Sequence, residues 1–181
     1  MVLIIVSFFW VASEIILTRV KHSTENNSVD RGSLKTLWRT IIASVTIGIF
    51  SGFQNIGRIN SHLFYWLGII CIIVGLVIRW TAILQLKQMF TVDVAIGSQQ
   101  RIIKNGIYNY IRHPAYAGSL LSFLGLGIAF SNILSIAIIF IPVCIAFLHR
   151  IKIEEKALVE AFGDEYLQYC RMTKRLIPKI Y

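Results

Sequence analysis

The stretch Gly106-Ile-Tyr-Asn-Tyr-Ile-Arg-His-Pro-Ala-Tyr-Ala-Gly118 lies between two apolar blocks and combines aromatic rings, a cation, an imidazole, a proline and glycines. Pro114 suits the first turn of a helix, where its missing N–H costs nothing, and the apolar residues 120–130 follow at once. Arg112 and His113 are therefore expected where an apolar helix begins. Because the start of a helix carries unpaired N–H groups and a partial positive charge, we expect an anionic ligand there.

Apolar blocks dominate the rest of the chain. Hydrophobic residues make up 56% of its 181 residues, above the roughly 45–50% of soluble domains. Five blocks approach the roughly 20 apolar residues that cross a bilayer, or about 17 at the short end; they cover residues 2–17, 37–53, 63–84, 115–130 and 133–148. Ser131 and Asn132 leave only a tight turn between the last two. The sequence thus predicts an all-α polytopic membrane bundle of about five transmembrane helices, formed by a single domain over residues 1–181.

The distribution of basic residues indicates how these blocks cross the membrane. Five lie between the first two blocks and at the start of the second, four precede the fourth block, and seven follow the fifth. The two remaining connectors hold only Arg58. Since Lys and Arg gather on the cytoplasmic side, we predict an external N-terminus and a cytoplasmic C-terminal tail. The net charge of +9 then indicates attraction to anionic headgroups rather than nucleic acid, for which no recognisable motif is present.

The C-terminal tail has its own helical pattern. Residues 149–162 have helical spacing, and we expect four packing positions in them: Ile151, Leu158, Ala161 and Phe162. Gly163 suits a C-cap and Asp164 an N-cap for a second helix over residues 165–172, with Tyr166 and Tyr169 on one face. Such a tail would lie on the bundle or fold back under it.

Arg150 and Glu154 lie one helical turn apart where the fifth block leaves the membrane. One interpretation is a juxtamembrane cation in a surface ion pair. The other is that Arg150 holds a substrate anion while Glu154 accepts hydrogen bonds from a polar or cationic ligand. His113 also has two interpretations, since a lone interfacial histidine can simply satisfy a carbonyl, but its neighbours Tyr108 and Tyr116 favour a ligand site.

Glu14 and Arg79 lie inside apolar blocks, where a charge is costly and usually pairs or lines a cavity. Either the two pair with each other, or Arg79 extends its charge to the membrane interface. The first block has no basic n-region and no small-residue cleavage site, so a retained helix is expected rather than a signal peptide. The short chain and the absence of a targeting peptide favour a prokaryotic plasma membrane.

Soluble enzyme classes lose support. The chain has no Gly-x-Gly-x-x-Gly, no phosphate-binding loop, no His-Glu-x-x-His and no Gly-x-Ser-x-Gly. Cys71, Cys144 and Cys170 have no regular spacing, so neither a disulfide framework nor a metal site is predicted.

Two motifs resemble those of the isoprenylcysteine carboxyl methyltransferase family, part of a broader set of membrane methyltransferases that includes phospholipid N-methyltransferases. The first is Gly106-x-Tyr108-x-x-x-Arg112-His113-Pro114-x-Tyr116-x-Gly118. The second is Arg150-x-x-x-Glu154-Glu155-x-x-Leu158-x-x-x-Phe162-Gly163-x-Glu165-Tyr166-x-x-Tyr169, followed by Arg175-Leu176-Ile177-Pro178. The likeness divides the chain into variable N-terminal helices, 1–62, and a cofactor- and substrate-binding core, 63–181.

The resemblance implies S-adenosylmethionine as methyl donor, bound on the cytosolic side and covered by the helical tail. The family's cofactor contacts fall on Gln100, Arg101, Ile102, Ile103, Tyr108, His113, Pro114, Ala115, Tyr116 and Glu154. Its substrate-orienting arginine falls on Arg150, the one catalytic and substrate-binding position implied. The chain departs from the family at Gln100, where a histidine is common, and at Asp93, which aligns with a glutamine.

The methyl acceptor stays open among three chemistries. Carboxyl methylation of a prenylcysteine-like lipid is the activity for which the family is named, and Arg150 favours an anionic acceptor. A phospholipid amine or the hydroxyl of another lipophilic metabolite is an alternative. From a different class, a non-catalytic membrane protein on the same scaffold would explain the intramembrane Glu14 and Arg79. No metal is predicted, and the oligomeric state is left undetermined.

Overall fold

A computed structural model describes residues 1–20, 32–59, 61–90 and 101–181. These residues form six α-helices: α1 (Val2–Val20), α2 (Ser33–Gly52), α3 (His62–Leu86), α4 (Pro114–Ala129), α5 (Ile133–Phe162) and α6 (Asp164–Met172). Two short 3-10 helices, η1 (Lys87–Met89) and η2 (Gly106–Asn109), lie between α3 and α4. The described part of the chain contains isolated bridges but no strand, so the predicted all-α class is confirmed.

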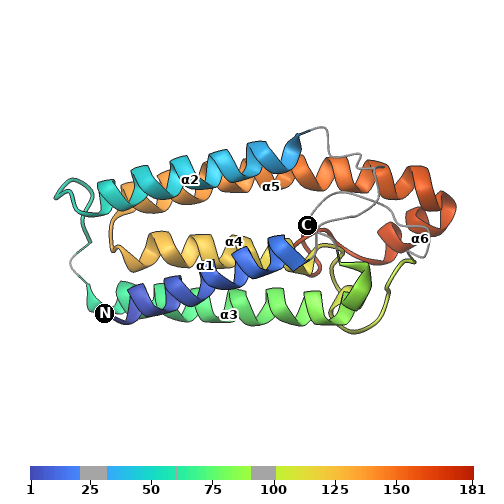
Figure 1. Ribbon diagram of the computed structural model, residues 1–181, viewed down its shortest axis with the longest axis horizontal. Coiled ribbons are helices and arrows are strands. Elements are labelled where there is room, and N and C mark those ends of the chain that lie inside the picture. The colour runs from blue at the N-terminus through green and yellow to red at the C-terminus, as the bar shows by residue number, and fades with distance from the viewer. Residues whose placement is uncertain (21–31, 60, 91–100) are drawn as a thin grey trace.

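Helices α1 to α5 lie side by side along the long axis of the molecule (Figure 1). Helix α2 packs against α5, α3 against α4, and α4 against α5. The N-terminus, the α2–α3 connection and the α4–α5 turn lie at one end of the bundle (Figure 1). At the other end α6 folds back from the end of α5, so the chemically rich segments gather there.

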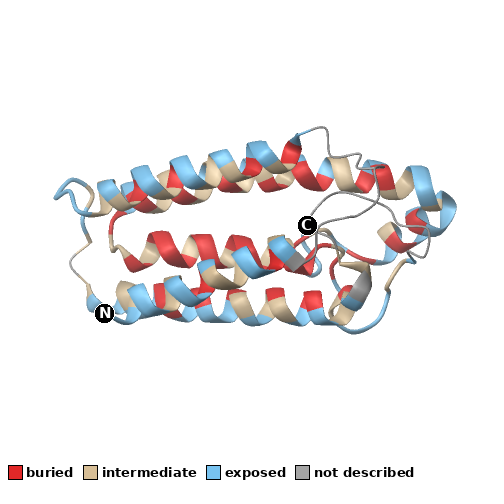
Figure 2. Ribbon diagram, in the orientation of Figure 1, coloured by how far each residue is buried: buried red, intermediate tan, exposed pale blue. Residues whose placement is uncertain are grey.

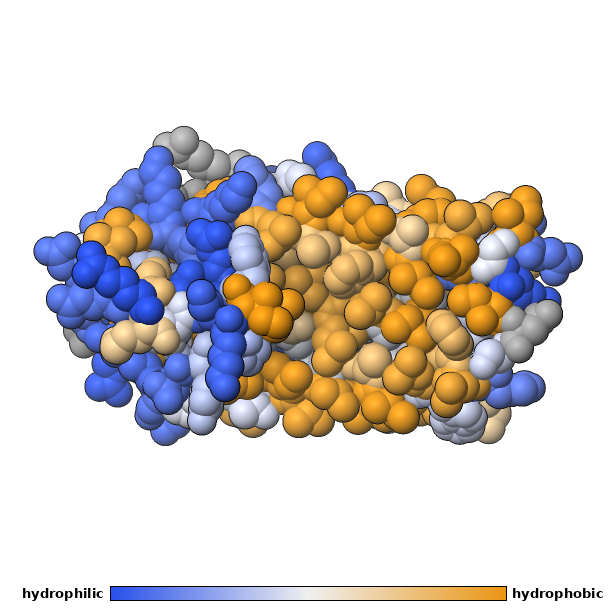
Figure 3. Space-filling view, turned by 180° about the vertical axis from the view of Figure 1, so that it is seen from behind, coloured by the Kyte–Doolittle hydropathy of each residue, from blue (hydrophilic) through white to orange (hydrophobic). Residues whose placement is uncertain are grey.

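A broad apolar belt covers part of one face of the bundle, and polar surfaces lie on both sides of it (Figure 3). Within the described residues, three helices are long and apolar enough to cross a membrane, spanning Val2–Arg19, His62–Leu86 and Ile133–Phe162, while α4 is apolar but shorter. With 30 residues, α5 is longer than the roughly 20 that a bilayer requires. Its last turns, from His149 onwards, therefore extend beyond the belt towards α6.

The closest packing in the bundle is between α3 and α4. A Cβ atom on Gly75 would lie 2.5 Å from the carbonyl oxygen of Gly118, and one on Gly118 would lie 2.5 Å from that of Gly75. Gly68, seven residues earlier in α3, and Gly125, seven residues later in α4, approach each other similarly. Small residues let helix backbones come this close, which is how membrane helices gain dispersion energy where no hydrophobic effect drives association.

We expect Gly75→Ala to lower the stability of the bundle by about 1–3 kcal/mol, because the new methyl group overlaps the α4 backbone, which cannot move aside like a flexible side chain. Thermal unfolding in detergent measures this. Val77→Ala, which changes an exposed side chain on the same helix, is the control. Equal losses from the two variants would contradict the packing argument.

The predicted turn between the last two apolar blocks is present. Ser131 adopts a positive φ of 49°, and the buried side chain of Asn132 caps α5 by accepting hydrogen bonds from the N–H groups of Leu134 and Ser135. The Asn132 amide also donates to three carbonyls near the end of α2: those of Ser51, Gln54 and Ile56. One side chain thus joins two turns at this end of the bundle.

The fifth predicted block and the helical pattern after it form one continuous helix, α5. Two details of the predicted tail are wrong. Asp164 lies inside α6 without capping it. Ala161 is exposed, whereas Ala157 is buried. The end of α5 next to α6 is largely exposed (Figure 2). The side of α5 that faces the protein interior includes the charged Glu155. A pattern of apolar residues therefore does not identify which residues of this helix are buried. Tyr166 and Tyr169 are both buried on one face of α6, as predicted.

Candidate functional site

A cavity of about 560 Å³ runs between the helices. Its apolar part is lined by side chains of α1 and α2, among them Trp10, Leu37 and Ile41. Its polar part is lined by His113 and by the end of α5, and α6 contributes Tyr166 and Tyr169. The cavity is therefore amphipathic, with one region suited to a hydrocarbon chain and one suited to a polar molecule.

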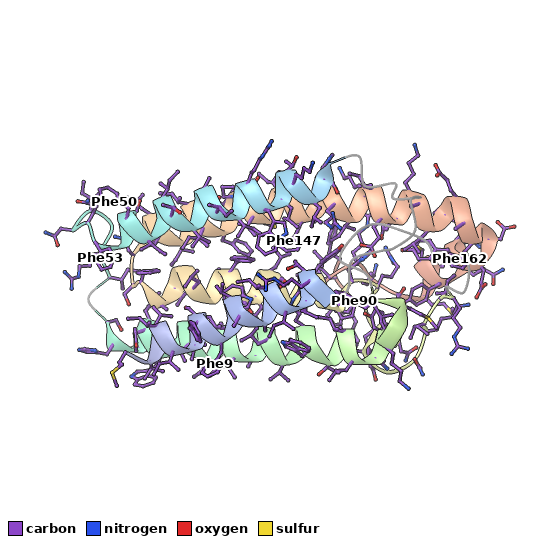
Figure 4. The ribbon with its side chains drawn as sticks, viewed as in Figure 1. Phe9, Phe50, Phe53, Phe90, Phe147 and Phe162 are labelled. Carbon is purple, nitrogen blue, oxygen red and sulfur yellow. The ribbon has the colours of Figure 1, made fainter. Side chains whose placement is uncertain are left out.

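A row of aromatic rings connects the two parts. Trp10 of α1 contacts Phe123 of α4, with ring centroids 4.8 Å apart. Phe147 of α5 continues the row to Tyr116, at 5.3 Å, and its side chain lies between α5 and the α1–α4 pair (Figure 4). The Tyr116 ring stacks on His113, with centroids 5.7 Å apart and planes at 12°. All five rings line the cavity, which gives it a rigid wall.

Glu154 faces the polar part of the cavity. Its Oε2 atom is buried and accepts no hydrogen bond from the described residues. Nδ1 of His113 is 3.8 Å from it, beyond hydrogen-bonding distance. A buried oxygen without a donor costs free energy, so this atom requires a ligand that donates.

Arg150 is 2% exposed and lines the same cavity. Its Nε donates to the Tyr116 hydroxyl at 3.2 Å and its Nη1 to Ser33 Oγ at 2.8 Å. Arg150 is therefore not a surface cation in an i,i+4 pair. The guanidinium lies inside the bundle, where α2, α4 and α5 meet.

The cavity gathers most of the site residues predicted from the sequence. It is lined by Arg101, Ile102, Ile103, Tyr108, His113, Ala115, Tyr116, Arg150 and Glu154. Pro114 does not line it; this residue is buried at the first position of α4, where a missing N–H is tolerated. Gln100 and Asp93 lie outside the described residues.

Tyr108 is held from two sides. Its hydroxyl donates to the carbonyl of Ala82 at 3.3 Å, and its own carbonyl accepts from the Tyr169 hydroxyl at 2.6 Å. Burial first, and then the charge of Glu154, raise the pKa of the Tyr108 phenol. Tyr108 therefore stays neutral and binds α6 to the loop before α4.

We predicted that backbone N–H groups at the start of α4 bind an anion, and for two of these groups the prediction is wrong. The N–H groups of Arg112 and His113 donate to the carbonyls of Lys174 and Arg175, at 2.7 and 3.0 Å. The Arg112 guanidinium donates to the carbonyl of Thr173 at 2.5 Å. The C-terminal tail thus uses donors that sequence reasoning assigned to a ligand.

Sequence reasoning missed the role of Glu155. Burial alone would raise the pKa of its carboxyl, but hydrogen bonds from His113 and Arg175, together with the charge of Arg112 and, when it is protonated, that of His113, lower it from 4.5 to about 2. Glu155 is thus ionised at neutral pH, and these interactions weaken only as the pH falls from about 4.5 to about 2. The one signal in the sequence was its place beside Glu154 in the second motif.

Of the two interpretations of the intramembrane charges, the structure shows pairing. Arg79 Nε and Nη2 donate to the two carboxylate oxygens of Glu14 at 2.5 and 2.6 Å, and Nη1 donates to Ser119 Oγ at 2.9 Å. Arg79 is 9% exposed, so it does not extend to the interface. The pair joins α1, α3 and α4 beside the cavity that both residues line.

Comparisons with known proteins agree with the motifs. A family model described as phospholipid methyltransferase matches residues 63–165. The chain is 34% identical to protein-S-isoprenylcysteine O-methyltransferase of Schizosaccharomyces pombe over 116 residues, which are 63% of this chain and 48% of that protein. It is 33% identical to protein-S-isoprenylcysteine O-methyltransferase A of Arabidopsis thaliana over 113 residues, 61% of this chain and 57% of that protein.

A solved structure has the same arrangement of helices. It is that of the eukaryotic intramembrane Ras methyltransferase, an isoprenylcysteine carboxyl methyltransferase, with a TM-score of 0.62 and 26% identity. The match covers 87% of this chain and 55% of that protein. The chain therefore spans about half the length of the relatives it matches.

Proposed function

The chain belongs to the phospholipid methyltransferase family, and on that premise we propose that it is an integral-membrane methyltransferase that uses S-adenosylmethionine as methyl donor. One observation carries the proposal: the buried Oε2 atom of Glu154, which accepts no hydrogen bond from the described residues, faces the polar part of a cavity that also has an apolar part. A cationic amine would satisfy that oxygen, and the apolar part would hold the hydrocarbon chain of an acceptor.

The described residues fit this cofactor. Glu154 suits its amine, while the rings of Tyr108 and Tyr116 and the side chains of Ile102 and Ile103 suit its adenine. When bound, the cofactor supplies a methyl carbon already activated by a sulfonium. The protein therefore mainly has to align the acceptor in line with that carbon and exclude water, which requires no catalytic triad.

We favour a carboxylate acceptor on a prenylcysteine-like or other lipophilic molecule. Arg150 lies inside the cavity rather than on the surface, and a guanidinium binds a carboxylate through paired N–H donors. A carboxylate nucleophile needs no base. The alternative is N- or O-methylation of a phospholipid or small lipid, which the description of the matching family model favours.

We further propose that α1 to α5 all cross the membrane, with the N-terminus outside and the cavity's polar part cytoplasmic. Two features support this. The basic residues gather at the end of the bundle that holds α6, and the apolar belt covers the helices between the two polar ends (Figure 3). The family match begins at residue 63, which agrees with a core over 63–181 and more variable helices before it.

Transfer of a labelled methyl group tests the proposal. Purified protein in detergent is incubated with methyl-labelled S-adenosylmethionine and a lipid extract, and the products are separated by mass. We expect a lipid product heavier by the mass of one labelled methyl group less one hydrogen; a base-labile ester identifies a carboxylate acceptor, and a base-stable methyl on the headgroup identifies an amine. Absence of both methyl transfer and cofactor binding would instead indicate a non-catalytic membrane protein.

A further inference from the structure

The carboxylate of Glu155 is the meeting point of three segments of the chain. Its Oε1 is 3.0 Å from Arg112 Nε and 3.3 Å from His113 Nε2. Its Oε2 accepts from Arg175 Nε at 2.9 Å and is 2.8 Å from Arg175 Nη2. Both oxygens are thus engaged, and Glu155 and His113 are only 9% and 5% exposed.

This contact decides which nitrogen of His113 carries the proton. An ionised carboxylate only accepts hydrogen bonds, so Nε2 of His113 must be the N–H that donates to Glu155. In the neutral imidazole, Nδ1 is then an acceptor. The ring cannot easily turn, because it is buried and stacked on Tyr116.

The other side of the ring faces Glu154. Nδ1 of His113 and Oε2 of Glu154 are 3.8 Å apart, with no hydrogen bond between them. Nδ1 of the neutral imidazole and Oε2 of Glu154 are both acceptors, so a group that donates to both would satisfy them. An ammonium group has three N–H donors and a positive charge, and would bind both atoms at once.

The geometry assigns Glu155 a positioning role: it holds His113 as the Nε2–H tautomer, so that Nδ1 and Glu154 Oε2 together accept hydrogen bonds from the amine of the cofactor. This inference rests on the proposed function for the identity of the amine. It goes beyond anchoring the tail, because Arg175 contacts Glu155 from the tail, whereas His113 contacts Glu155 and lines the cavity.

Nitrogen NMR of the protein labelled with ¹⁵N-histidine tests the tautomer directly. The chain has four histidines, and the His113 signals are identified by their loss in His113→Gln. Spectra are recorded at increasing pH until the neutral imidazole is observed. We expect the protonated-nitrogen shift on Nε2; a proton on Nδ1 would overturn the inference, with or without cofactor.

Cofactor affinity supplies the second test. We expect Glu155→Gln to raise the Kd for S-adenosylmethionine about 10-fold, in the range of one hydrogen bond to a charged group. The Kd for 5′-methylthioadenosine, which lacks the amine, should stay unchanged. Two controls are matched: Arg175→Gln removes the tail contact but not the histidine contact, and Glu160→Gln changes an exposed glutamate of the same helix.

The outcomes distinguish failure of the positioning role of Glu155 from failure of the proposed function. If the parent protein binds S-adenosylmethionine but Glu155→Gln binds it equally well, the positioning role is wrong while the proposed function stands. An equal loss of affinity in Arg175→Gln would also overturn it, because Glu155 would then act through the tail. If the parent binds no S-adenosylmethionine, the proposed function fails, and the NMR measurement still decides the tautomer.

Discussion

Replacing Glu154 by glutamine is expected to raise the Kd for S-adenosylmethionine about 100-fold without unfolding the protein. The substitution keeps the size of the side chain but removes the charge that faces the cavity. Truncating one partner of a buried charged hydrogen bond typically costs about 2–5 kcal/mol, and 1.4 kcal/mol is tenfold in affinity. Folding should survive, because Oε2 of Glu154 accepts no hydrogen bond from the described residues.

Titration calorimetry in detergent measures this effect, and two ligands show whether it arises at the amine. S-adenosylhomocysteine keeps the amine and should lose affinity like the methyl donor. By contrast, 5′-methylthioadenosine should bind parent and variant equally. Glu160→Gln, on the exposed side of α5, is the matched control. Parent-like binding of S-adenosylmethionine by Glu154→Gln would remove the central observation behind the proposed function.

Replacing Arg150 by lysine is expected to lower kcat/KM about 100-fold for a carboxylate acceptor while the Kd for S-adenosylmethionine changes about twofold at most. Lysine keeps the positive charge but loses the planar fork that binds a carboxylate through two N–H groups. A hydrogen bond to a charged group contributes about 1.5–3 kcal/mol, so losing the fork accounts for a change of this size.

The assay compares a prenylcysteine with a phosphatidylethanolamine, and Arg171→Lys, an exposed arginine of α6, is the control. Loss confined to the prenylcysteine supports the carboxylate acceptor. If methylation of the phospholipid is the faster reaction and Arg150→Lys leaves it unchanged, the acceptor is the amine, and Arg150 has a structural role through Ser33 and Tyr116.

Local sequence was sufficient for the helices. The predicted block over residues 63–84 became α3 (His62–Leu86), and the block over 115–130 became α4 (Pro114–Ala129). Apolar runs and turn residues act over one or two helical turns, so their pattern is visible without the fold. The two motifs, one around His113 and one around Glu154, likewise predicted two polar segments at one end of the bundle, and these segments lie together there.

Only the tertiary structure decided how charges are paired. Glu14 binds Arg79, which is 65 residues away in the sequence. The carboxylate of Glu155 has three partners, two from the residues just before α4 and one from the C-terminal tail. The C-terminal tail also accepts hydrogen bonds from the backbone N–H groups of Arg112 and His113, which were expected to bind an anion. Helical and hydrophobic preferences belong to neighbouring residues and can be read along the chain. A buried charge is stabilised by whichever group the fold brings within about 3 Å, and no local pattern specifies that partner.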